Sequence, residues 1–132
     1  MRRDMEYCIK ILRDLANGEH KDVLYLSHKF TPEITVEEEL ENKKYLYHLE
    51  ILEGAGFIEY EIDGISGGNL IRDCPLLTWE GNDFLDMVEN DTLWNKTKEA
   101  AKEKGFEVTK MPLEILVNFT KMKAKEMLGI EI

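Results

Sequence analysis

The residue types that most often carry out chemistry are few and scattered in this sequence. Cys8 and Cys74 stand in unrelated contexts, and no pair of cysteines or histidines has the spacing of a zinc site. His20 and His28 have no cluster of cysteines or carboxylates at metal-binding spacing beside them. The glycines of residues 64–68 lack the Lys-Ser/Thr pair and the helix that follow in a phosphate-binding loop. We therefore predict no catalytic site, no metal and no cofactor, and a protein that is not an enzyme.

A short polar segment has the side chains that commonly contact DNA. On a helix, these side chains could reach a groove or the phosphates. The candidate contact residues are Asn42, Lys43, Lys44, Tyr47 and His48. Six glutamates share residues 37–53 with them, whereas DNA binding normally uses several Lys or Arg contacts to phosphates. Two interpretations stay open: a DNA-contacting surface, or lysines that only solvate an exposed helix face.

The distribution of charge bears on the choice of partner. Among 132 residues, 27 are acidic and 17 are Lys or Arg, which gives a net charge of −10. Residues 1–91 hold 9 basic and 21 acidic residues, a balance of −12, whereas residues 92–132 hold 8 and 6, a balance of +2. No apolar run approaches the roughly 20 residues of a membrane span, and the N-terminus lacks the apolar core of a signal peptide. The sequence therefore predicts a cytoplasmic protein without a membrane partner.

The elements that must position these residues follow from periodicity and end signals. Helical spacing of apolar residues predicts helices over 4–16 and 35–53, and Thr35 with Glu38 forms a capping box. The second stretch is one helix, or two if Asn42 caps a second one. Alternating residues predict strands over 57–62 and 70–74, joined by a loop over 63–69. Three further helices are expected, beginning at Thr78, at an Asp91 cap and at Pro112.

This order of elements predicts a mainly helical α+β protein. Residues 1–90 would form a winged helix-turn-helix-like core with a two-stranded wing. Residues 91–132 would form a C-terminal helical extension packed on that core, so that the two parts make one structural domain.

The last predicted helix is apolar on two faces. One stripe runs from Leu113 to Leu128, and a second consists of Ile115, Phe119 and Met122. A helix apolar on two faces is either deeply buried or shared with a partner, so we predict a homodimer or a partner surface here. The alternative is that Phe119 packs onto Trp94 of the same chain.

Several motifs resemble those of known proteins. The stretch from His48 to Ile58 looks like the end of a winged-helix recognition helix, and Leu77 to Leu85 resembles the start of the helix after the wing. With the opening residues 2–5 and the run 90–99, the chain resembles a bacterial family, domain of unknown function 2513. That resemblance implies a winged-helix-like fold and an association with phages and mobile elements. It implies no reaction and no catalytic residues.

Two functions follow as hypotheses. The first is a DNA-associated regulatory or accessory protein of a phage or mobile element, with double-stranded DNA as its partner. The second is an acidic protein–protein interaction module that does not bind DNA.

Overall fold

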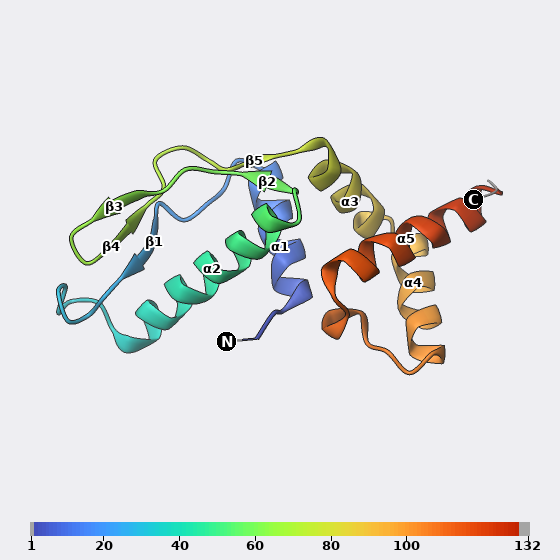
Figure 1. Cartoon of the computed structure of the whole chain (residues 1–132), viewed down its shortest axis with the longest axis horizontal. Helices are drawn as coiled ribbons and strands as arrows, with labels where there is room; N and C mark the ends of the chain where they lie inside the picture. Colours follow the sequence, from blue (N-terminus) through green and yellow to red (C-terminus); the bar gives the residue numbers. More distant parts are fainter. Residues whose placement is uncertain (1, 130–132) are drawn as a thin grey trace.

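The computed structural model describes residues 2–129, which form five α-helices and two small antiparallel sheets. The three-stranded sheet lies at one end of the molecule beside α2, and α3, α4 and α5 lie at the other end (Figure 1). The elements follow the chain in this order: α1 (Met5–Ala16), β1 (Val23–Leu26), α2 (Val36–Gly54), β2 (Ile58–Glu59), β3 (Asp63–Ile65), β4 (Gly68–Leu70), β5 (Leu76–Leu77), α3 (Trp79–Glu89), α4 (Asp91–Glu103), the 3-10 helix η1 (Val108–Lys110) and α5 (Leu113–Leu128). The predicted α+β class, mainly helical, is confirmed.

Local capping explains where the helices begin. Thr35 Oγ1 accepts the Glu38 backbone N–H at 3.1 Å, which confirms the predicted cap of α2. Thr78 caps α3 in the same way, through the Gly81 N–H at 3.1 Å. The cap of α4 is Asn90, not the predicted Asp91, because the Asn90 amide oxygen accepts the N–H three residues on.

Of the two alternatives for residues 35–53, the structure has the single helix, and Asn42 does not cap a second one. Helix α2 runs without a break from Val36 to Gly54, and Asn42 lies in its second turn. The N–H donors that Asn42 would have capped are already bonded within the helix, since only the first turn leaves them free. Within residues 2–129 the core therefore carries one long helix where a helix-turn-helix was expected.

The predicted wing is also built differently. Strand β4 lies between β1 and β3 in a three-stranded sheet, and β2 pairs with β5 in a separate two-stranded sheet. The predicted loop over 63–69 contains the tight β3–β4 hairpin, in which Gly67 takes the turn position with a φ of +79°. The predicted strand over 57–62 contains only β2, and the one over 70–74 contains only the last residue of β4, so the two chain segments separate between the sheets.

Helix α3 lies against the chain that leaves α2. The Thr78 hydroxyl donates a hydrogen bond to the Gly56 carbonyl at 2.5 Å. Gly81 sits so close to Phe57 that an added Cβ would lie 2.1 Å from the Phe57 carbonyl oxygen. Thr78 and Gly81 of the Leu-Thr-x-x-Gly motif therefore tie α3 to the end of α2.

One hydrophobic cluster joins the two predicted parts of the chain. It includes Met5 and Leu12 of α1 and Leu49 of α2, and it continues to Ala101 of α4 and Leu116 of α5. The boundary at residue 90 stays a prediction. None of the helices between residues 2 and 129 is long and apolar enough to cross a membrane.

Candidate functional site

His48 is placed inside the protein, away from any surface that DNA could contact. Its side chain is 0% exposed. Its Nε2 accepts the Asp4 backbone N–H at 2.9 Å, and its Nδ1 lies 2.7 Å from the Lys44 carbonyl oxygen. Because Nε2 accepts, the proton sits on Nδ1 and is donated to that carbonyl. His48 is therefore a structural link between the start of α1 and the middle of α2.

The two lysines beside it are held by neighbouring aromatic rings. The Lys44 ammonium lies 4.4 Å from the centre of the Tyr7 ring, and the Lys43 ammonium lies 5.1 Å from that of Tyr25. Lys43 also lies 3.4 Å from a Glu39 carboxylate oxygen. These cation–π contacts and the Lys43–Glu39 ion pair engage both charges within the chain.

Glu39 is the centre of a hydrogen-bonded group that fastens β1 to α2. It is only 7% exposed. One carboxylate oxygen accepts the Tyr25 hydroxyl at 3.2 Å, and the other accepts the ring Nδ1–H and the backbone N–H of His28. Hydrogen bonding from His28, opposed by burial, holds the pKa of Glu39 down at about 2.

This depressed pKa makes an acid-dependent contribution to stability. The Glu39 carboxylate stabilises the fold fully above its ordinary pKa of about 4.5, and that contribution is lost as the pH falls towards about 2. We therefore expect Glu39→Gln to destabilise the protein at neutral pH and to approach the wild type as the pH falls through this window. Chemical denaturation at several pH values measures the difference.

The exposed neighbour Glu38 provides the control for that experiment. Glu38→Gln removes a carboxylate from the same turn of α2. This carboxylate takes no part in the hydrogen bonds of Glu39 with Tyr25 and His28. The substitution should leave the acid-induced unfolding close to that of the wild type. A gap between Glu39→Gln and the wild type that stays constant from neutral pH to about pH 2 would contradict the assigned role of Glu39.

The outer face of α2 is apolar, which the sequence did not lead us to expect. We give the name outer face to the solvent-facing row at helical spacing formed by Val36, Leu40, Lys43 and Tyr47. Val36 is 52% exposed and Leu40 is 55% exposed, while Tyr47 is half-buried. α2 therefore exposes two apolar side chains, Val36 and Leu40, on the side opposite to its buried apolar residues. Asn42 lies off this row and is half-buried.

The sequence signal for the outer face lies in its apolar residues and not in the polar segment beside them. Val36 and Leu40 are four residues apart and out of step with the buried residues Tyr45, Leu49 and Leu52. This second set of apolar residues at helical spacing, on another side of the helix, is the sequence signal that predicts the outer face.

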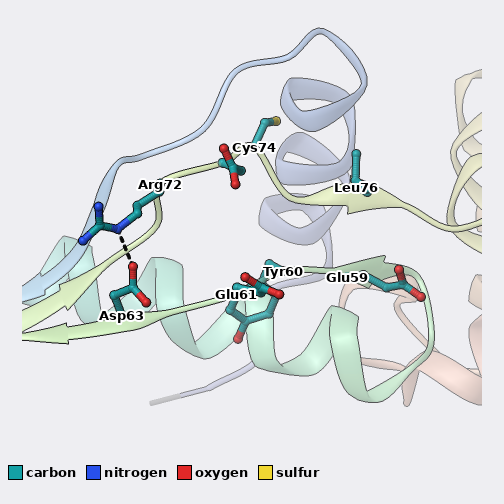
Figure 2. A pocket seen from close by; sticks show the side chains of 8 residues that line it. Glu59, Tyr60, Glu61, Asp63, Arg72, Cys74 and Leu76 are labelled. Carbon is teal, nitrogen blue, oxygen red and sulfur yellow. Dashed lines mark hydrogen bonds and ion pairs between the residues drawn. The ribbon is translucent and has the colours of Figure 1, made fainter.

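A cavity of about 420 Å³ opens where the hairpin segments separate (Figure 2). Glu59, Tyr60 and Glu61 line one side, and Arg72 and Cys74 line the other. The one basic side chain there, Arg72, is already paired with Asp63. Burial, and then the carboxylates of Glu53 and Glu50, raise the pKa of Tyr60 to about 12. The lining of this cavity carries the carboxylates of Glu59, Glu61, Asp63 and Asp73 against the single guanidinium of Arg72, a charge balance that disfavours nucleic acid.

The same region gives no sign of metal binding or thiol chemistry. In the part of the chain that the structure describes, no group of three or more His, Cys, Asp and Glu side chains could hold a metal ion. Both thiols are free. Burial raises the pKa of the Cys8 thiol to about 12, so Cys8 stays protonated and packs as a small hydrophobic side chain.

The C-terminal candidate residues lie on α5, away from the α2 site (Figure 1). Ile115 is 55% exposed, Met122 is also exposed, and Phe119 is half-buried against the core. Trp94 packs against the same core, and the contact of Phe119 with Trp94 stays a prediction. The two candidate surfaces, on α2 and on α5, are separate.

Comparison with known proteins agrees with the resemblance seen in the sequence. A family model described as "Hypothetical protein (DUF2513)" matches residues 2–107. A protein of Haemophilus influenzae described as "Uncharacterized protein" is 40% identical over 63 residues, which is 48% of this chain and 52% of that relative. The chain thus spans about half the length of this curated relative. No solved structure matches the chain. Because the family model covers most of the sequence, the protein belongs to the DUF2513 family.

Proposed function

We propose that the protein is a non-catalytic protein-interaction module that docks a partner on the outer face of α2. The observation that carries this proposal is the exposure of Val36 and Leu40, at 52% and 55%, on the helix expected to read DNA. Apolar side chains held in water on a rigid helix favour a partner that covers them. A DNA-reading helix would instead present donors and positive charge at this place.

The charges around the outer face indicate what kind of partner fits. Glu37 is exposed beside this row and Glu50 is exposed at its next position along the helix, and neither forms an ion pair within residues 2–129. An amphipathic helix with an apolar stripe and flanking Lys or Arg residues complements such a surface. The partner we propose is therefore a helical protein segment with basic edges.

The placement of the DNA-contact candidates supports this choice over a DNA-associated role in a phage or mobile element. His48 is enclosed, and Lys43 and Lys44 lie against aromatic rings. The DNA-associated role, which rests on the resemblance, is the alternative that a binding experiment can decide.

Titration of the protein against a labelled duplex of about 30 base pairs, at about 20 mM salt, separates the two functions. We expect no saturable change in fluorescence anisotropy, because too few basic groups are free to displace counterions. Binding that weakens steeply with added salt would overturn the proposal if Lys43→Glu/Lys44→Glu abolishes it. The matched control for charge is Lys102→Glu/Lys104→Glu at the end of α4, which should retain any such binding.

A further inference from the structure

The outward face of α5 carries apolar residues on both sides of a midpoint next to Phe119. Leu113, Leu116 and Thr120 turn into the core, and the opposite side of the helix carries Ile115 and Met122, both exposed. Half-buried Phe119 lies between them at the edge of this face. The three residues follow the spacing i, i+4, i+7 and therefore form one short stripe.

This stripe has its midpoint close to Phe119. If a second copy of α5 lies antiparallel across it, Ile115 faces Met122 of the second copy and Phe119 lies beside Phe119 of the second copy. A two-fold axis requires this kind of self-complementary surface, in which each contact occurs twice. The antiparallel arrangement therefore covers all three apolar side chains at once.

The charges along one edge of the stripe follow the same symmetry. Glu114 lies at the start of this edge, and Lys121 and Lys125 lie towards its end, at helical spacing. None of the three forms an ion pair within residues 2–129. Antiparallel pairing brings Glu114 of each copy between the two lysines of the other. On the opposite edge, Lys123 pairs with Glu126 of its own chain at 3.1 Å and adds no repulsion.

We propose that α5 forms an antiparallel, two-fold symmetric homodimer centred on Phe119, with Glu114 facing Lys121 and Lys125 of the second copy. The occupant is a second copy because apolar pattern and charge pattern share one symmetry centre. The surface is small, so the dimer is weak, with a dissociation constant on the order of 10 μM. The inference does not depend on the partner proposed for α2, because the two surfaces are separate.

Exchanging the charges tests the pairing directly by analytical ultracentrifugation of the full chain. Glu114→Lys places three positive charges on each edge, and Lys121→Glu/Lys125→Glu places three negative ones there. Each variant should dimerise at least roughly tenfold more weakly than the wild type, because both symmetric contacts become repulsive. The variant with all three changes should recover the dimer, since its pairs are only reversed.

Mixing the two repulsive variants gives a result that a structural defect could not mimic. Each edge then faces the opposite charge, so a heterodimer should form where neither variant dimerises alone. Lys104→Glu, on an exposed site beyond α4, is the control for net charge and should dimerise like the wild type.

Two results would overturn the dimer. One is a wild-type chain that stays monomeric at about 0.5 mM, well above the expected dissociation constant. The other is a dimer that is unaffected by the charge changes and by Ile115→Glu, which introduces a charge at an exposed position of the stripe. Circular dichroism of each variant shows whether the fold is kept. Loss of DNA or partner binding at α2 would leave these outcomes unchanged.

Discussion

Replacing Gly68 with alanine is expected to destabilise the fold by about 3 kcal/mol or more, because the added methyl group meets the backbone of the neighbouring strand. The added Cβ would lie 1.6 Å from the carbonyl oxygen of Tyr25 and 2.8 Å from a methyl carbon of Leu26. The nearest clashing atom belongs to the backbone of β1, so β1 and β4 must move apart to make room for the added Cβ. Urea unfolding followed by circular dichroism measures the loss.

Gly64 in the facing strand is the matched control. An alanine Cβ there would meet nothing within 4 Å, and the residue does not need a positive φ. Gly64→Ala should therefore change the stability by less than about 0.5 kcal/mol, or raise it slightly by restricting the unfolded chain. Similar losses from Gly64→Ala and Gly68→Ala would show that the close contact between β1 and β4 does not exist.

Truncating His48 is expected to have the second-largest effect. His48→Ala removes a fully buried ring and leaves the Asp4 N–H without its acceptor, so we expect a loss of about 3 kcal/mol. His48→Phe keeps a ring of similar size but not the hydrogen bonds, and should cost about 1–3 kcal/mol. The two variants separate the contribution of packing from that of hydrogen bonding.

The control for His48 is a surface residue on the same helix. Glu50→Ala, at an exposed position of α2, should change the stability by less than about 0.5 kcal/mol. If His48→Ala were as mild as Glu50→Ala, the ring would have to be solvent-accessible. A contact between His48 and DNA would then be possible again.

The local parts of the fold could be predicted from the sequence, because their causes lie within a few residues. Thr35 and Thr78 each accept a hydrogen bond from the residue three positions on, and α2 ends at Gly54, one residue past the predicted end. The sheets could not be predicted in the same way. Strand β1 pairs with β4, which is more than forty residues away, and the glycines of the β3–β4 hairpin have the composition of a loop.

The candidate site was predicted less well, again for a physical reason. The polar type of His48 suggested a surface residue, although its spacing from Tyr45 and Leu52 matches the buried side of α2. The acceptor role that makes its burial favourable depends on Asp4, which the sequence places 44 residues away. The outer face could have been predicted from Val36 and Leu40, because their positions on α2 lie on a different side from its buried residues.

The most direct test of a protein-docking α2 is photo-crosslinking from its outer face. A benzoylphenylalanine in place of Leu40 reacts with whatever molecule covers this position when the protein is expressed in cells. The same group in place of the exposed Glu19, in the turn after α1, is the control. We expect an adduct from position 40 alone that proteases remove and nucleases leave intact. An adduct that nucleases remove, or equal labelling from both positions, would contradict the account.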